Sequence, residues 1–282
     1  MTLRIALLLP VLLLSACSTL SKVSVGPTYD YPAIVREVLQ KGLVEGDEAV
    51  INKYVAADYI QHNPHAEDGR AGLIKFVREM QKAPAAQRIT IKVVRLFQDG
   101  EFVVAHSDVW LGGPLAVFDV WRVRDGMLVE HWDCMQAQPE HSVSGHSMLD
   151  GATTVADKDK TDANRKLVRA FVESVLGRGE VEKIDDYIGD ECTQHNPHVA
   201  DGKDALRNFI TSMRTRGARF SYEPVRVIGA GNFVLVQAKA IRNGRDTVIN
   251  DLFRVQAGKI VEHWDTIQEV PLESANSNGM LP

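Results

Sequence analysis

The chain repeats itself at long range. The pentapeptide Gln-His-Asn-Pro-His stands at residues 61–65 and again at 194–198, and Val-Glu-His-Trp-Asp stands at 129–133 and again at 261–265. The offsets are 133 residues (194 − 61) and 132 residues (261 − 129), far above the roughly 20–50 residues of solenoid repeats. The period predicts a duplicated module in which each copy is a complete domain with its own core. Polar residues kept in both copies are the best candidates for a functional site.

Composition excludes some partners and some chemistries. The 282 residues carry a formal net charge of −5 and no basic cluster, so we expect no nucleic-acid partner. The sequence lacks a glycine-rich phosphate loop, a Gly-x-Ser-x-Gly elbow and a Cys/His nucleophile pair. We therefore expect neither nucleotide-dependent chemistry nor a cofactor.

The first residues predict an export signal. Arg4 precedes an apolar run over residues 5–14, which is too short to span a bilayer. The following Leu-Ser-Ala-Cys, ending at Cys17, resembles the bacterial lipobox, in which the Cys becomes the lipidated first residue. Ser18 after it resembles the outer-membrane sorting signal of Gram-negative lipoproteins. We expect an envelope protein held by a lipid anchor in the outer membrane and facing the periplasm. The alternative is an ordinary signal peptide.

Helical and strand patterns follow the same order in both copies. Each copy shows three helical segments and then four strand-like segments joined by short turns, which is an α+β layout with a pocket between helices and sheet. The predicted helices cover about 32–46, 47–54 and a segment after Asp68, then 161–177, 180–188 and 203–215. The predicted strands cover 89–98, 101–111, 114–124 and 127–136, then 219–229, 232–242, 245–255 and 258–268. The predicted organisation is a signal peptide 1–17, a tether 18–29, module 1 at 30–140, a linker 141–160, module 2 at 161–272 and a polar tail 273–282.

Two longer motifs identify a family resemblance. Q-H-N-P-H-x-x-D-G begins at Gln61 and Gln194, and D-x-[WF]-R-V-x-x-G-x-[LI]-V-E-H-W-D-x-[MI]-Q begins at Asp119 and Asp251. Both resemble the SnoaL-like group of the nuclear-transport-factor-2-like superfamily, which includes polyketide cyclases, over nearly the whole mature chain. The resemblance implies two tandem cone-shaped α+β barrel domains, each with three helices packed on a curled antiparallel sheet. It also implies that Asp119 and Asp251 match the acid/base Asp of the cyclases, and that the modules pair sheet to sheet as an intramolecular pseudo-dimer.

The last hairpin of each module predicts where the chemistry lies. Ala257 resists the positive φ of a two-residue type I′ turn, so we expect a three-residue loop in both copies. That register places Asp119 opposite His131 and Asp251 opposite His263, whereas a two-residue turn would break both pairs. Asp133 and Asp265 share the same face. We expect catalytic Asp119, His131, Asp251 and His263; the alternative is a polar network that closes the barrel end.

Further residues are candidates for contact with a ligand. A two-residue Gly112-Gly113 turn would place His106 opposite Asp119; its counterpart is Gln237, so we expect module 1 to be the active one. We place His62 and His195 at the mouths of the cavities, with a backbone-bonded turn as the alternative, and we interpret His65 as structural. The predicted ligand-contacting residues are His62, Asn63, His106, Trp121, Asp133, His195, Asn196 and Asp265.

Three further interpretations concern metals, cysteines and tryptophans. His62, His131 and Asp133 could form a two-His, one-carboxylate set, but His-x-x-His on a Pro-constrained loop lacks the spacing of a helical ligand pair, and we expect no metal. Cys134 and Cys192 are expected to be buried free thiols, with a disulfide between the modules as the alternative. Trp132 and Trp264 should face away from the neighbouring His residues, into a core or an interface.

Three functions remain open at this point. The first is a cofactor-free cyclase, aldol-type lyase or isomerase acting on a small apolar carbonyl compound by Asp/His acid–base chemistry. The second is a non-catalytic lipoprotein that binds a hydrophobic small molecule. The third is an envelope scaffold. Because a fold does not fix a function, the choice depends on the site itself.

Overall fold

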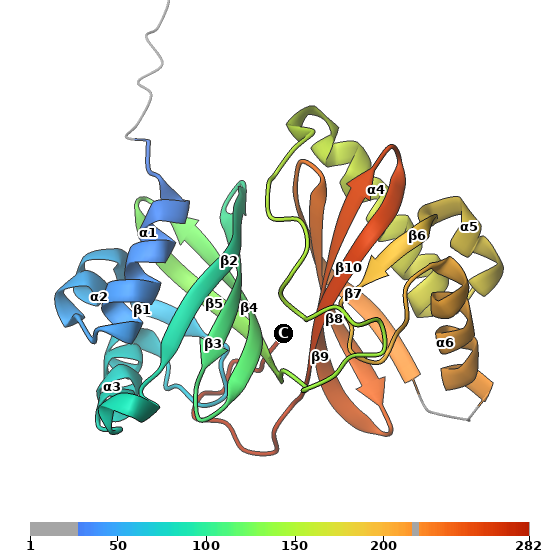
Figure 1. Ribbon diagram of the computed structural model, residues 1–282. Coiled ribbons are helices and arrows are strands. Elements are labelled where there is room, and N and C mark those ends of the chain that lie inside the picture. The colour runs from blue at the N-terminus through green and yellow to red at the C-terminus, as the bar shows by residue number, and fades with distance from the viewer. Residues whose placement is uncertain (1–27, 216–219, 282) are drawn as a thin grey trace, which may run out of the picture.

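The computed structural model describes residues 28–215 and 220–281, which form two modules of the same architecture (Figure 1). Each module holds one five-stranded sheet, in the order β1-β5-β4-β3-β2 in module 1 and β6-β10-β9-β8-β7 in module 2. The helices cover one face of each sheet, on the outer sides of the molecule (Figure 1). The predicted α+β class and the two tandem cone-shaped domains are confirmed.

The elements of module 1 begin with a helical layer and continue as a hairpin meander. Its helical segments are α1 (Tyr31–Glu37), which continues as the π-helical η1 (Val38–Val44), α2 (Glu48–Tyr54), α3 (Gly69–Gln81) and the short η2 (Ala85–Gln87). Its strands are β1 (Val55–Gln61), β2 (Thr90–Asp99), β3 (Phe102–Trp110), β4 (Pro114–Arg124) and β5 (Met127–Ala137).

Module 2 repeats these elements in the same order. Its helical segments are η3 (Lys158–Lys160), α4 (Thr161–Phe171), η4 (Val172–Arg178), η5 (Val181–Lys183), α5 (Ile184–Tyr187) and α6 (Lys203–Thr215). Its strands are β6 (Ile188–Gln194), β7 (Phe220–Ala230), β8 (Phe233–Arg242), β9 (Arg245–Gln256) and β10 (Lys259–Glu269).

Each module contains one strand that the sequence pattern did not predict. Strand β1 pairs in parallel with β5, and β6 pairs in parallel with β10, so the sheets are mixed and not purely antiparallel. Each missed strand has seven residues and follows a helix directly. No Gly or Pro separates helix from strand at Tyr54–Val55 or Tyr187–Ile188, so the usual signal of a boundary is absent.

The last hairpin corrects the predicted register. The turn has two residues, with φ of 50° at Asp125 and 79° at Gly126, and in module 2 with 50° at Ala257 and 75° at Gly258. The three-residue loop was therefore wrong, because the sheet forces even Ala257 into the left-handed region. The Asp and His residues still share one face, because a β-bulge follows at Val129 and at Val261. A bulge adds one residue to one strand and so restores the side-chain parity that the turn had flipped.

The bulge also changes which residues lie opposite one another. Asp119 lies opposite Asp133, and His131 lies opposite Trp121. In module 2, Asp251 lies opposite Asp265 in the same way. The two carboxyl groups of each site therefore face each other across neighbouring strands. The His side chain contacts the Asp of the other strand, Asp119 or Asp251, as a diagonal neighbour.

A second hairpin also differs from the prediction. Strands β3 and β4 pair Trp110 with Pro114, which leaves three residues in the loop where two were expected. His106 therefore lies opposite Phe118 and on the face away from Asp119. The prediction that His106 faces Asp119 was wrong because Gly113, whose φ is not positive, joins Gly112 and Leu111 in a wider turn.

The faces turned away from the helices pack against each other. One hydrophobic cluster contains Phe118 and Trp132 of module 1 together with Phe233 and Trp264 of module 2, so both tryptophans lie in a core, as predicted. Cys134 donates weak hydrogen bonds to the carbonyl oxygens of Val248 and Thr266 across this contact. Cys134 and Cys192 are free and buried, which confirms that prediction.

The segments that follow β5 and β10 cross to the other module. We call residues 141–150 the linker arm and residues 272–281 the C-terminal arm. Val143 donates from its backbone N–H to the carbonyl oxygen of Pro197, and Ala275 donates in the same way to Pro64. The two donors are 132 residues apart (275 − 143), so the repeat extends into the segments that were predicted to be a linker and a tail.

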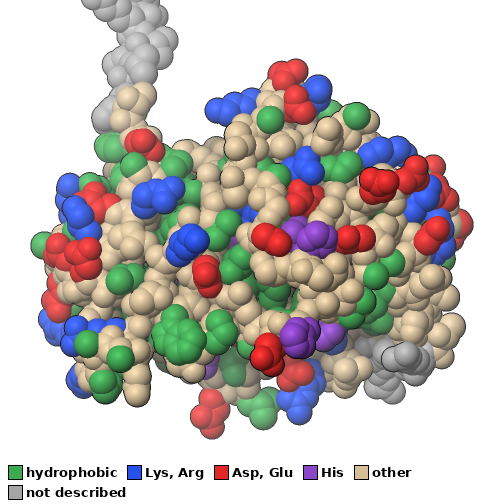
Figure 2. All heavy atoms as spheres, in the orientation of Figure 1, with side chains coloured by type: hydrophobic (Ala, Val, Ile, Leu, Met, Phe, Trp, Pro, Cys, Tyr) green, Lys and Arg blue, Asp and Glu red, His purple; other side chains and the backbone are tan. Residues whose placement is uncertain are grey.

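The predicted signal peptide, the lipidated Cys17 and nearly all of the tether lie outside the described residues. Helices in the described ranges all fall short of the length and hydropathy that a membrane crossing needs. On the face shown in Figure 2, Lys and Arg side chains alternate with Asp and Glu side chains and leave no continuous basic area.

Candidate functional site

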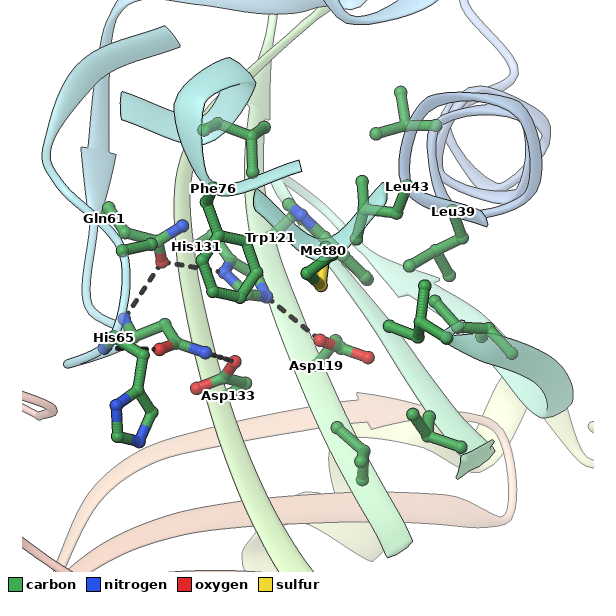
Figure 3. A pocket seen from close by; sticks show the side chains of 18 of the residues that line it. Leu39, Leu43, Gln61, His65, Phe76, Met80, Asp119, Trp121, His131 and Asp133 are labelled. Atoms are coloured by element: carbon green, nitrogen blue, oxygen red, sulfur yellow. Dashed lines mark hydrogen bonds and ion pairs between the residues drawn. The ribbon is translucent and has the colours of Figure 1, made fainter. Parts of the chain in front are cut away.

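A cavity of about 300 Å³ lies between the helices and the inner face of the module 1 sheet. Apolar side chains from η1, α3 and the strands form most of its wall, and the polar groups gather at one end, where β4 and β5 meet the loop after β1 (Figure 3). The apolar lining includes Leu39, Leu43, Leu73, Phe76, Met80, Ile89, Ile91, Val109, Val117 and Leu128.

The central polar group of this cavity is the pair of Asp119 and His131. The Nε2 atom of His131 lies 3.0 Å from Oδ1 of Asp119, and its Nδ1 atom lies 2.9 Å from Oε1 of Gln61 (Figure 3). Burial by itself lowers the pKa of His131, but the hydrogen bond to Asp119 and the charges of Asp133 and Asp119 raise it above its usual value. The pair therefore favours the charged form of the imidazole beside the Asp119 carboxylate.

Asp133 completes the polar end of the cavity. Its Oδ2 accepts a hydrogen bond of 2.5 Å from the Asn63 side chain, and its buried Oδ1 has no partner among the residues that the structure describes. Burial raises the pKa of Asp133; the His131 charge opposes this effect and the Asp119 charge adds to it. Asp133 is thus a buried carboxyl group that keeps a proton more readily than an exposed one.

Aromatic rings close the cavity around the His131 imidazole. Trp121 stacks on it with ring centroids 5.0 Å apart, and Tyr59 lies parallel at 6.5 Å. Trp121 was predicted to contact a ligand, and it lines the cavity. Tyr59 was not predicted, because its counterpart in the other copy is Cys192 and the repeat therefore marked it as variable.

Module 2 carries the same polar arrangement around a smaller space. His263 lies 3.0 Å from Asp251 through Nε2 and 2.9 Å from Gln194 through Nδ1, and Asn196 donates to Asp265. Burial raises the pKa of Asp265 to about 6; the His263 charge opposes the shift and the Asp251 charge adds to it. The cavity beside these groups measures only about 80 Å³.

Comparison with known domain families decides the identity of the modules. The SnoaL-like domain matches residues 35–131 and again residues 168–263. The chain belongs to the SnoaL-like family. Its fold is the nuclear-transport-factor-2-like fold, so that part of the predicted resemblance is confirmed. No curated protein matches the sequence significantly.

Solved structures resemble the SnoaL-like modules at low sequence identity. IdmH of Streptomyces antibioticus, a candidate polyketide cyclase, is 15% identical, with 37% of this chain and 91% of IdmH covered and a TM-score of 0.32. An LEH-like epoxide hydrolase of M. tuberculosis is 20% identical, with 39% and 85% covered and a TM-score of 0.34. A candidate ketosteroid isomerase of Kribbella flavida is 14% identical, with 40% and 82% covered and a TM-score of 0.36. These likenesses concern the fold alone.

Several predicted site residues lie elsewhere in this SnoaL-like chain. His62 and His195 are not at the cavity mouths; they are buried on the opposite face of each sheet and stack on Trp132 and Trp264 with centroids 4.9 and 4.7 Å apart. His106 lies on that face as well, stacked on Phe118 at 4.0 Å. The missed strand explains the first error, because β1 and β6 carry their last residues into the sheet, where side chains alternate between the two faces.

The loop after β1 contributes other residues than expected. Asn63 lines the cavity as predicted, and so does the exposed His65, which we had interpreted as structural. Gln61 orients His131 and was not selected, although its presence in both copies was a usable signal. Asn196 and His198 line the smaller cavity in the same way.

The polar triads also have a geometry that could hold a cation. Asp119, His131 and Asp133 offer ligand atoms that all lie within 4.8 Å of one another, and Asp251, His263 and Asp265 do the same. A metal needs a free imidazole nitrogen. The charges of Asp133 and Asp119 that raise the pKa of His131 against the effect of burial would also attract a cation, so a proton and a metal ion would compete for the same imidazole nitrogen.

Proposed function

We propose that module 1 is a cofactor-free acid–base site that acts on a small apolar carbonyl compound, as a cyclase, an aldol-type lyase or an isomerase. The observation that carries this proposal is the Asp119–His131 pair with Asp133, set at the end of an apolar cavity of about 300 Å³. Paired carboxyl groups in unlike environments are the usual means of acid–base catalysis near neutral pH.

Each polar group has a distinct role in this mechanism. Asp119 takes a proton from the carbon next to the substrate carbonyl, and the electron pair moves to the carbonyl oxygen to give an enolate. Asp133, when protonated, donates a hydrogen bond to that oxygen. Asp119 then returns the proton to another carbon of an isomerase substrate, or to the new alkoxide of an aldol product. His131, held by Gln61, fixes the orientation of Asp119.

Proton exchange on a simple ketone tests this proposal directly. The substrate is 2-tetralone, a flat apolar ketone with acidic α protons, incubated in D₂O and followed by NMR. The wild-type protein should accelerate deuteration of the α carbon, and Asp119→Asn should lose about 10²–10⁴-fold of the acceleration. The matched variant Asp251→Asn in module 2 should keep it. Equal exchange with and without wild-type protein would contradict the acid–base function.

The second candidate is a non-catalytic lipoprotein that binds a hydrophobic small molecule. The almost wholly apolar wall of the cavity favours a binding function, and so does the predicted location in the cell envelope. In this function Cys17 carries a lipid anchor in the outer membrane, and the protein faces the periplasm. In this function Asp119→Asn weakens the hydrogen bond between the carboxylate and the ligand but does not abolish binding. Mass spectrometry of the mature N-terminal peptide tests the anchor. The peptide should begin at Cys17 and carry acyl groups, and Cys17→Ser should release the protein from the membrane.

We also propose that the two modules form an intramolecular pseudo-dimer with their cavities facing away from each other. The shared cluster around Trp132 and Trp264 supports this arrangement, since a large apolar contact resists relative motion of two domains. Small-angle scattering should report one compact particle. A scattering curve of two independently tumbling domains would overturn the proposal.

A further inference from the structure

The two cavities share part of their lining and differ at several positions, of which one adds a hydroxyl group to module 2. Leu43, Phe76 and Met80 of module 1 correspond to Leu176, Phe209 and Met213 of module 2, and all six line their cavities. On the strand at the far side, however, Ile91 corresponds to Tyr222. The two positions correspond because each lies four residues before the arginine that follows a β-bulge. This arginine is Arg95 in module 1 and Arg226 in module 2.

The hydroxyl group of Tyr222 fills a hydrogen-bonding position that is open in module 1. It donates to Oδ2 of Asp251 over 2.5 Å, while Oδ1 of the same carboxylate faces His263. In module 1 the equivalent oxygen, Oδ2 of Asp119, accepts no hydrogen bond from any residue in the described ranges, and Ile91 has no group to donate.

The burial of Tyr222 and the volumes of the two cavities agree with this difference between the modules. Tyr222 is only 7% exposed, and burial together with the Asp251 charge raises its pKa, so the phenol keeps the proton that it donates. Phe220 is also larger than its counterpart Ile89, and the cavity shrinks from about 300 Å³ to about 80 Å³. The phenol thus takes up part of the space, and the polar contact, that module 1 leaves free.

We propose that Tyr222 occupies in module 2 the place that the ligand occupies in module 1. This inference rests on the proposed function of module 1 as a small-molecule site. Module 2 is then closed by its own side chain, and Tyr222 is the residue that decides which module accepts a ligand. The phenol also describes that ligand: a flat, mainly apolar ring with a hydroxyl group that donates to Asp119.

Reciprocal exchange of Ile91 and Tyr222 tests the proposal. The probe is 2-naphthol, titrated into the chain without its signal peptide by isothermal calorimetry. We expect one molecule bound per wild-type chain, two for Tyr222→Ile, and none for Ile91→Tyr. Because a hydrogen bond to a charged group contributes about 1.5–3 kcal/mol, 2-methoxynaphthalene, which cannot donate, should bind at least about tenfold more weakly.

Two controls separate the possible failures. Tyr222→Phe keeps the ring in place but removes the hydroxyl group, and this variant should still bind one molecule of probe. It therefore tests whether the volume of the ring closes the module 2 cavity without the hydrogen bond to Asp251. A wild type that binds no probe would contradict the function proposed for module 1. A wild type with one site whose binding survives Ile91→Tyr, or a folded Tyr222→Ile with no second site, would overturn the role of Tyr222. The Ile91→Tyr result stands even if Tyr222→Ile does not fold.

Discussion

The Nδ1 atom of His62 donates a hydrogen bond to the carbonyl oxygen of Gly279, 217 residues away, over 2.6 Å. In the other module, Nδ1 of His195 lies 2.7 Å from the carbonyl oxygen of Ser147. Ser147 and Gly279 are again 132 residues apart (279 − 147). Each module therefore has its His-Asn-Pro-His loop closed by the arm of the other, and the loops in turn hold Asn63 and Asn196 against the carboxyl groups of the sites.

Replacement of His62 should cost stability and loosen the loop that holds Asn63 against Asp133. His62 is buried, stacks on Trp132 and pairs with Glu130 through Nε2 at 2.8 Å. His62→Ala removes these contacts and leaves a void, so we expect a loss of about 2–4 kcal/mol in urea unfolding. The control is His65→Ala in the same loop. This side chain is exposed, and its loss should change stability by less than about 0.5 kcal/mol. Equal effects of the two changes would refute a structural role specific to His62.

Removal of the C-terminal arm should loosen one loop and spare the other. Asn276 and Asn278 donate side-chain hydrogen bonds to the backbone of residues 61–66, and Met280 and Leu281 are buried in the core between the sheets. A chain that stops after residue 271 should show faster amide hydrogen exchange over residues 61–66. The loop at 194–199 is an internal control, because the linker arm still holds it. Unchanged exchange at 61–66 would show that the arm does not brace the site.

The sequence predicted the arrangement within each module better than the contacts between modules. The cluster of Asp119, His131 and Asp133 was predicted because both copies of the repeat contain it. The predicted turn length was wrong, but the bulge at Val129 restores the side-chain parity, so the three residues still share one face. His62 and His195 were misplaced because their side chains depend on short strands that no Gly or Pro announces. The arms are rich in small and polar residues without periodicity, and their order comes from backbone and side-chain hydrogen bonds to the other module, which no local pattern encodes. Tyr222 was not singled out because it differs between the copies.

Ionisation of Asp265 should lower the stability of the folded chain as the pH rises. Burial raises the pKa of Asp265 to about 6, above the value near 3.9 of an unfolded chain. A group whose folded pKa is raised stabilises the fold at low pH, and this contribution is lost as the pH rises through about 6. The raised pKa of His263 acts in the same direction.

Asp265→Asn should remove this dependence. The Asn side chain can still accept the hydrogen bond from Asn196 through its oxygen, but it carries no buried charge. We expect the variant to be more stable than the wild type by roughly 1–3 kcal/mol at pH 8 and to differ little at pH 4. Urea unfolding at both pH values measures this, with Asp246→Asn, an exposed position on β9, as the control. A variant less stable than the wild type at pH 8 would mean that the Asp265 carboxylate is needed in its charged form.

The hairpin at Ala257 offers a direct test of backbone strain in the turn. Ala257 is exposed and adopts φ of 50°, where its Cβ crowds the following carbonyl oxygen at a cost of about 1–2 kcal/mol. Asn tolerates this region, and Asn-Gly is a preferred pair in a type I′ turn. Ala257→Asn should therefore raise the free energy of unfolding by about 0.5–1 kcal/mol with an unchanged urea dependence. The matched change Asp125→Asn, where both residues tolerate the turn, should have almost no effect. If Ala257→Asn instead destabilised the chain, the left-handed backbone of Ala257 would not be a source of strain in this turn.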